Sequence, residues 1–258
     1  MSDEHSTIYA AFWLYKVRAK FRQLEDARRE RIRREFADTV DMAKGAVTLR
    51  GAYSLAGLRS DADLMLWVHS PDLGRLHALA AALRKTALGS YLDDAYSYVG
   101  MVPQSQYAPE HRPAFTKGFP PRTYLSMYPF VKTHEWYQLP FERRRQMMGE
   151  HGRLGQKHSA LPEVRIETEP AAASGQGGVA VAPVAPPMAL GRVQANTIHS
   201  FGLGDQEFVV AFEADDPADI VHMVEDLRAA EVRLYTAIDT PIFLGYRKSL
   251  AEALEDLG

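Results

Sequence analysis

The chain has 258 residues, of which 46% are hydrophobic and 24% are charged, and this composition is typical of a soluble globular protein with one large or two smaller domains. Its net charge of -3 gives no electrostatic reason to expect nucleic acid as a partner. Cysteine is absent, which excludes disulfides, thiolate nucleophiles, zinc–thiolate clusters and iron–sulfur clusters, so any metal chemistry must use His, Asp, Glu or Tyr.

The first half of the chain predicts a ferredoxin-like unit. Apolar runs of strand length alternate with segments whose apolar residues recur at helical spacing. The expected elements are a strand at 7–16, a helix at 21–45, strands within 46–58 and 62–70, a helix at 71–89 and a strand at 95–102. Their order is βαββαβ.

The second half repeats this order. Gly57-Leu58 aligns with Gly202-Leu203, and Asp63 aligns with Glu207 after a one-residue gap. In both copies the acidic residue precedes a short apolar run and then a helix start that contains proline. An internal repeat of about half the chain indicates two fused copies of one unit.

These patterns predict an α+β fold of two fused ferredoxin-like repeats, the dimeric α+β barrel type, with antiparallel sheets forming a barrel and helices outside. We place the N-terminal repeat at 1–110 and the C-terminal repeat at 111–258. The second copy should begin with a strand at 122–131 and a helix at 140–152 that ends at a histidine and a glycine. Such a fold leaves an enclosed site between sheet and helices.

Residues 161–190 interrupt the second repeat. They are rich in Pro, Gly, Ala and Val and have no helical or alternating period, so we expect a flexible insertion. The alternative is a lid over a site, or a segment packed on a neighbouring subunit, because long loops in compact domains are often functional.

No apolar run approaches the roughly 20 residues that a membrane-spanning helix needs. The N-terminal residues also lack the basic segment, apolar core and cleavage site of a signal peptide. We therefore expect a cytoplasmic protein without a membrane span.

Three residues are candidates for chemistry: His111, Tyr128 and His151. Each has an ordinary explanation, because a buried tyrosine is usually a core residue and a histidine at a helix end complements the helix dipole. The sequence contains no His-Glu-x-x-His motif, no carboxylate cluster with metal-site spacing, no glycine-rich phosphate loop and no Gly-x-Ser-x-Gly motif. A single imidazole remains sufficient for haem iron, because the porphyrin supplies the other four ligands.

The stretch "YPFVKTHEWYQLPFERRRQMMGEHG" at 128–152 closely resembles the central motif of the chlorite dismutase-like superfamily and, within it, of the actinobacterial-type coproheme decarboxylases. The resemblance covers nearly the whole chain outside 161–190. It also rests on "LRGAYSLAGLRSDADLMLWVH", "HRPAF", "VQANTIHSFGLGDQEFVVAFEADDP" and "DTPIF", which follow one another with family-like spacing.

The resemblance implies a role for each candidate. His151 would be the proximal iron ligand, Tyr128 the redox-active residue and His111 a distal histidine that helps to activate hydrogen peroxide. Lys132 stands where family members place a basic residue near the porphyrin propionates. Chlorite dismutases carry a distal arginine on the strand after the proximal helix; Ala195 stands there instead, next to a glutamine, which counts against chlorite chemistry.

The implied reaction converts iron coproporphyrin III (coproheme), which is both substrate and redox cofactor, to haem b. Two hydrogen peroxide-dependent oxidative decarboxylations of propionates release carbon dioxide, as the last step of coproporphyrin-dependent haem synthesis. The resemblance also implies a homo-oligomeric ring, a pentamer in the family, and a transient contact with coproporphyrin ferrochelatase.

Three rival functions follow from the same residues. A haem-binding or haem-transfer protein without turnover would need His151 but not Tyr128 and His111 together. A chlorite-degrading haem enzyme would need the distal arginine. A purely structural barrel that assembles into a ring would need none of the three, and their presence weighs against it.

Overall fold

A computed structural model describes residues 7–102, 112–159 and 191–258. The candidate His111, the insertion at 161–190 and the proposed boundary between the repeats therefore lie outside the described residues. Among the described residues, no helix is long and apolar enough to cross a membrane.

The N-terminal half contains the predicted order of strands and helices. Its elements are β1 (Ile8–Val17), α1 (Ala19–Arg22), α2 (Asp26–Met42), β2 (Thr48–Ser54), β3 (Leu64–Ser70), α3 (Leu73–Lys85), the short 3-10 helix η1 (Leu88–Tyr91) and β4 (Leu92–Val102). The Asp72 side chain caps α3 by accepting a hydrogen bond from the Gly74 amide at 2.7 Å.

The C-terminal half repeats this order and adds a strand and a helix. Its elements are η2 (Ala114–Lys117), β5 (Tyr124–Lys132), α4 (His134–Gln138), α5 (Phe141–Ser159), β6 (Val193–His199), β7 (Phe208–Ala214), α6 (Pro217–Arg228), η3 (Glu231–Tyr235), β8 (Thr236–Ile238), β9 (Phe243–Lys248) and α7 (Leu250–Glu255). Asp216 caps α6 as Asp72 caps α3, through the Ala218 amide at 2.9 Å.

The strands form one antiparallel sheet that closes on itself. Among the described residues it has nine strands in the order β7-β6-β4-β1-β3-β2-β9-β5-β8, and β7 also pairs with β5. Each half has the ferredoxin-like order, β4-β1-β3-β2 and β6-β7-β5-β8. Strand β9 joins the halves on one side, between β2 and β5, and the pair Met101–His199 joins them on the other. The predicted α+β barrel of two repeats is confirmed.

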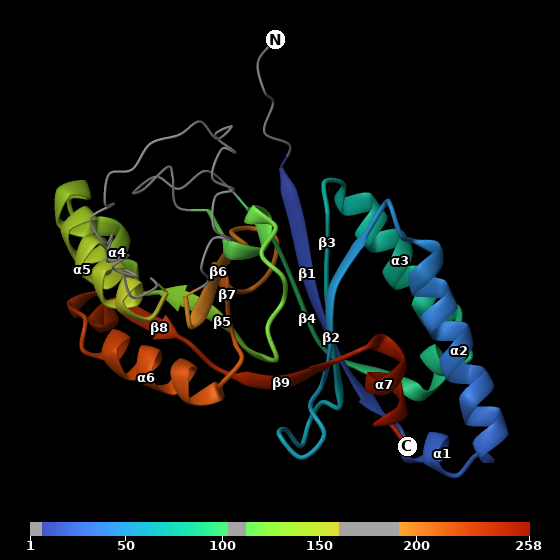
Figure 1. Cartoon of the computed structure of the whole chain (residues 1–258). Helices are drawn as coiled ribbons and strands as arrows, with labels where there is room; N and C mark the ends of the chain where they lie inside the picture. The colour runs from blue at the N-terminus through green and yellow to red at the C-terminus, as the bar shows by residue number, and fades with distance from the viewer. Residues whose placement is uncertain (1–6, 103–111, 160–190) are drawn as a thin grey trace, which may run out of the picture.

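Helices cover the outer faces of the two halves. In Figure 1, α2, α3 and α7 lie on one side of the strands and α4, α5 and α6 on the other. Leu254 of the last helix, α7, and Leu257 after it are buried in the same core as Phe36 of α2, so the chain returns to the N-terminal half at its end.

The helix that carries His151 is longer than the sequence predicted. Helix α5 runs from Phe141 to Ser159, so the prediction that it ends at His151 and Gly152 is wrong. A glycine inside a helix costs about 1 kcal/mol relative to alanine, but tertiary contacts override this preference, and α5 packs against α6, η3 and β6. His151 is a mid-helix residue, and the dipole at a helix C-terminus does not explain it.

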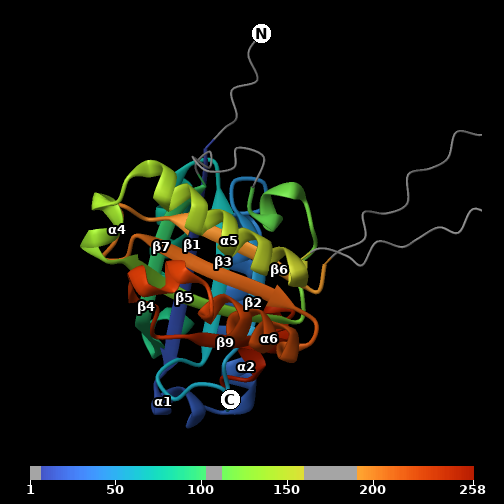
Figure 2. The ribbon, with the colours of Figure 1, turned by 90° about the vertical axis from the view of Figure 1, so that its left-hand side faces the viewer.

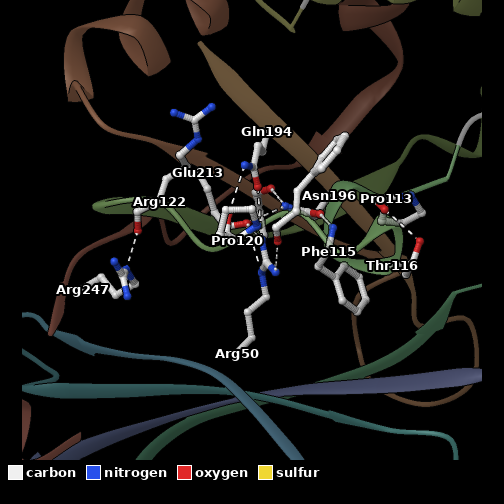
Figure 3. A network of polar contacts seen from close by, with 12 residues as sticks. Arg50, Pro113, Phe115, Thr116, Pro120, Arg122, Gln194, Asn196, Glu213 and Arg247 are labelled. Atoms are coloured by element: carbon white, nitrogen blue, oxygen red, sulfur yellow. Dashed lines mark hydrogen bonds and ion pairs between the residues drawn. The ribbon is translucent and has the colours of Figure 1, made fainter. Parts of the chain in front are cut away.

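A buried ion pair crosses the barrel between the two halves (Figure 3). Arg50 of β2 donates to Glu213 of β7 at 2.6 Å, and their side chains are only 6% and 0% exposed. Asn196 of β6 also donates to Glu213, at 3.2 Å, and accepts from the Phe115 amide at 2.9 Å. The guanidinium of Arg50 lies 5.0 Å from the centroid of the Trp67 ring. The network ties β2, β6, β7 and η2 together inside the barrel.

We expect Glu213→Leu to lower the free energy of unfolding by about 3–5 kcal/mol, because it leaves Arg50 buried without its partner. Urea unfolding followed by circular dichroism measures this. Asp93→Ala is the control, because it removes the partner of Arg18 from an exposed ion pair and should leave the midpoint nearly unchanged. Equal small shifts in both variants would contradict the role given to the buried pair.

Candidate functional site

Strand β5 separates the barrel interior from the helix layer of the C-terminal half. Side chains alternate along a strand, and Leu125 and Met127 are fully buried in the barrel interior. Tyr128, Phe130 and Lys132 therefore project to the opposite face. Figure 2 shows α5 and α6 lying across this face of the C-terminal half.

The helix-facing side of the sheet is apolar around Tyr128. Tyr128 and Phe130 pack against a cluster that includes Val210 and Phe212 of β7 and Met223 of α6. The rings of Tyr128 and Phe212 meet edge to face, with centroids 6.2 Å apart. Burial raises the pKa of Tyr128 to about 12, and the nearby Asp239 carboxylate adds to the rise. Tyr128 is therefore a neutral phenol, with its proton, throughout the physiological range.

Two arginines beside Tyr128 share one carboxylate. Arg228 at the end of α6 and Arg233 of η3 lie 2.9 and 3.1 Å from the same oxygen of Asp239. Both arginines oppose the rise in the pKa of Tyr128, which places their charges near the phenol. Two positive charges against one negative charge leave this cluster with a net positive charge.

Lys132 holds its ammonium group among aromatic rings. Its Nζ atom lies 4.5 Å from the centroid of the Trp136 ring and 5.1 Å from that of Phe130. Burial lowers the pKa of Lys132 to about 8; the Glu207 carboxylate opposes this change and Arg233 adds to it. The side chain is thus a cation at neutral pH, held by rings more than by a paired carboxylate.

His151 projects from α5 with one ring nitrogen unpaired. Its Nδ1 atom is buried and has no hydrogen-bond partner among the described residues. Burial, together with the positive charge of Lys132, lowers the pKa of His151 to about 4. The imidazole is therefore neutral at physiological pH, which is the form that binds a metal ion.

Strand β6 presents Ala195 and Gln194 to opposite sides. Ala195 packs in the helix-facing cluster that contains Tyr128. Gln194 points into the barrel, where it accepts from Arg50 at 3.2 Å and donates to the Pro120 carbonyl at 3.2 Å. Of the two neighbours, alanine faces the candidate site.

The structure thus brings together four of the five residues predicted from the sequence. Tyr128, Lys132 and Ala195 share one face of the sheet, and the charge of Lys132 reaches His151 on α5. His111 lies outside the described residues. The arrangement combines a neutral imidazole, a half-buried phenol and a cation beside apolar side chains. A neutral imidazole can bind a metal ion, and an ammonium group can bind an anion.

The sequence profile of the chlorite dismutase family matches residues 29–176 and 187–248, which together include most of the chain. The chain belongs to this family. It is 36% identical over 231 residues to the coproheme decarboxylase of Mycolicibacterium smegmatis, covering 86% of each protein. It is 25% identical over 240 residues to that of Staphylococcus carnosus, covering 86% of this chain and 82% of the relative.

The family fold is also found among solved structures. Chlorite dismutase of Candidatus Nitrospira defluvii in complex with imidazole aligns with a TM-score of 0.78 at 23% identity, covering 97% of this chain and 94% of that one. At this identity the likeness concerns the fold.

Sequence reasoning missed the charged cluster of Arg228, Arg233 and Asp239, whose charges act on Tyr128. Its members come from a helix end, a 3-10 helix and a loop, and their spacing matches no motif. The strand period could have indicated part of the site, because Tyr128 and Lys132 are four residues apart and share a face.

We expect the Lys132 ammonium to titrate near pH 8, so that its charge is present below that pH and lost above it. Replacing Glu207 with Gln should lower this pKa, because an attractive carboxylate is lost, and Arg233→Met should raise it, because a repelling cation is lost. The ¹³Cε shift of Lys132, assigned with Lys132→Met, measures both changes. Shifts in the same direction would contradict this account of the charges.

Proposed function

We propose that the protein is a coproheme decarboxylase, which converts iron coproporphyrin III to haem b with hydrogen peroxide as oxidant. The observation that carries the proposal is the convergence of Tyr128, Lys132 and His151 on one side of the C-terminal sheet. Two relatives named coproheme decarboxylase, one of them 36% identical, support the same conclusion.

The residues present fit an iron porphyrin. His151 offers a neutral imidazole with a buried nitrogen that has no hydrogen-bond partner among the described residues, and a haem protein needs one such ligand from the chain. Phe130, half-buried against the cluster of Val210 and Phe212, offers an apolar side chain to the face of a macrocycle. Lys132, with the positive cluster beside Tyr128, suits its carboxylates.

The bound iron, together with hydrogen peroxide, supplies the oxidising equivalents for the reaction. Each propionate loses a hydrogen atom, one further electron and its carboxylate carbon, and leaves a vinyl group and carbon dioxide. One hydrogen peroxide takes up the two electrons with two protons and becomes two water molecules. Two propionates react, so two peroxides are consumed per haem b.

Tyr128 provides the hydrogen-abstracting group. Because its pKa is raised to about 12, the phenol keeps its proton until it is oxidised, and it then loses one electron and one proton together. The resulting phenoxyl radical takes a hydrogen atom from the propionate and becomes a phenol again. The edge-to-face contact with Phe212 holds the ring of Tyr128 in place.

Lys132 orients the reacting carboxylate. Its ammonium group can donate a charge-assisted hydrogen bond, and the rings of Trp136 and Phe130 restrict where that group lies. Arg228 and Arg233 can bind further propionates. Asp239 neutralises only one of their two charges, and both arginines act on the pKa of Tyr128.

His111 would accept the peroxide proton, since an unperturbed imidazole has a pKa of about 6.5. It precedes the described segment that begins at Arg112. Ala195 would border the porphyrin on the strand where chlorite dismutases carry an arginine, and an alanine side chain has no charge to offer there. This disfavours chlorite degradation as the activity.

The assembly and location of the protein belong to the same proposal. We infer a homo-oligomer, a pentameric ring as the family resemblance implies, a transient contact with coproporphyrin ferrochelatase and a cytoplasmic location. Analytical ultracentrifugation of the full chain tests the first of these directly.

We expect His151→Ala to abolish or strongly weaken axial ligation of coproheme iron while the fold is retained, because the imidazole is the proposed ligand. Absorption and resonance Raman spectra of the iron complex measure the ligation, and circular dichroism measures the fold. His158→Ala is the matched control: His158, near the end of the same helix, pairs with Asp226. Wild-type spectra in His151→Ala would remove this residue from the site.

We expect Tyr128→Phe to bind coproheme nearly as well as the wild type and to form almost no haem b, because phenylalanine has no hydroxyl hydrogen to lose. Mass spectrometry of the porphyrins after peroxide addition measures the products. Tyr124→Phe, a substitution on the same strand, is the control and should remain active. A haem carrier would form no haem b in any variant, and wild-type turnover in Tyr128→Phe would disprove the radical role.

We expect His111→Ala to retain coproheme binding and to slow turnover most at low peroxide concentration, because only the acceptor of the peroxide proton is removed. The rate of haem b formation is measured against peroxide concentration. An unchanged dependence on peroxide would contradict the role assigned to His111.

A further inference from the structure

Glu207, which lies between β6 and β7, binds the end of the strand that carries Lys132. One oxygen of its carboxylate, Oε2, accepts a hydrogen bond from the Lys132 amide at 2.7 Å and from the Tyr137 hydroxyl at 2.6 Å. The Glu207 amide donates to the Phe130 carbonyl at 3.2 Å. A single residue therefore connects the end of β5, the β6–β7 turn and helix α4.

At the end of β5, the Glu207 carboxylate takes the place of a neighbouring strand as hydrogen-bond partner. The ladder between β5 and β7 ends at the pair Phe130–Phe208, which leaves the Lys132 amide beyond the last paired residue. On its other edge β5 pairs with β8, and the register shifts between Val131 and Lys132. A register shift of this kind redirects side chains and often occurs beside functional sites. The Glu207 carboxylate satisfies the amide at this irregular strand end.

The N-terminal repeat has the same arrangement at Asp63. The Asp63 carboxylate accepts from the Val17 amide at 2.8 Å, and the Asp63 amide donates to the Tyr15 carbonyl at 2.8 Å. The backbone carbonyl of Asp63 accepts from Leu55, as that of Glu207 accepts from Ser200. The sequence repeat that aligns these two acidic residues is therefore a repeat of their hydrogen bonds.

The two copies differ in the residue whose amide is held. In the N-terminal repeat it is Val17, which is buried in the core beneath α2. In the C-terminal repeat it is Lys132, whose ammonium lies over Trp136. In both repeats the acidic residue stabilises the end of a strand. In the C-terminal repeat, Glu207 also fixes the backbone of Lys132, whose side chain is a cation of the candidate site.

We propose that Glu207 is a positioning residue for porphyrin binding: its carboxylate fixes the backbone of Lys132 so that the ammonium group of Lys132 meets a propionate of the substrate. This inference deepens the proposed function and rests on it. Glu207 acts through Lys132. Its hydrogen bond to the Lys132 amide fixes the backbone of Lys132, and the rings of Trp136 and Phe130 fix the position of the ammonium group.

The test is a double-mutant cycle on the affinity for iron coproporphyrin III, measured by absorption titration without peroxide. Glu207→Ala should raise the dissociation constant about tenfold, the effect expected from one lost hydrogen bond at a charged group. Lys132→Met keeps the length of the side chain and removes its charge. In that background, Glu207→Ala should change the affinity by less than about twofold, because the positioned group is already gone.

Asp63→Ala is the matched control, because Asp63 makes the same backbone hydrogen bonds in the repeat without the porphyrin. Both alanine variants should lower the urea midpoint, but only Glu207→Ala should weaken binding. In steady-state assays, Glu207→Ala should raise KM for coproheme and also lower kcat, because Lys132 both holds the substrate and orients the reacting carboxylate. A residue that served the fold alone would give the same result in both repeats.

Glu207→Gln keeps an oxygen that can accept from the Lys132 amide, so it should recover most of the affinity that alanine loses. If Glu207→Ala does not fold, Glu207→Met, which keeps the length of the side chain without its carboxylate, takes its place in the cycle with Lys132→Met. Wild-type affinity in Glu207→Ala, or an equal loss with and without Lys132, would overturn the positioning role alone. Failure of the wild-type protein to bind coproheme would overturn the proposed function and this inference together.

Discussion

The alternation of side chains along β5 organises both the barrel and the site. Leu125 and Met127 enter the barrel interior, while Tyr128 and Lys132 face the helices. A shift of one residue would send the phenol and the ammonium into the apolar barrel and the apolar residues out of it. The register is held by β7 on one edge and by β9 and β8 on the other. Barrel closure and site geometry therefore depend on the same set of hydrogen bonds.

The two halves of the barrel share the same local turns and hydrogen bonds but place different residues beneath their helices. In both copies an aspartate caps the third helix, a glycine with positive φ forms the turn, and an acidic residue binds the end of the first strand. The N-terminal copy fills the space beneath its helices with residues such as Phe36 and Leu79. The C-terminal copy places Lys132 and His151 in the corresponding layer.

The electrostatics of this layer suit an anionic ligand that carries a metal. Lys132 and His151 both have lowered pKa values because burial disfavours their charged forms, and the charge of one acts on the other. A bound carboxylate would stabilise the ammonium group, and a metal ion would use the neutral imidazole. In the proposed function, these groups bind the iron and the propionates of a metalloporphyrin, and the chain belongs to the chlorite dismutase family.

The sequence by itself determined the number and order of most strands and helices, because apolar spacing and turn residues are local properties. It also indicated the duplication, and the alignment of Asp63 with Glu207 proved to be an alignment of hydrogen bonds. The roles of Tyr128 and His151 came from resemblance to a family. Their spacing alone left ordinary core and capping explanations open.

Only the tertiary structure decided which residues meet. Helix α5 continues past Gly152 because its neighbours override the local preference of glycine, so His151 lies in mid-helix. Arg50 and Glu213 are 163 positions apart, and their pairing follows from closure of the barrel. The cluster of Arg228, Arg233 and Asp239 likewise depends on how a helix end and a loop pack beside β5. Contacts between distant segments have no local signal in the sequence, since they arise only when the sheet closes and the helices cover it.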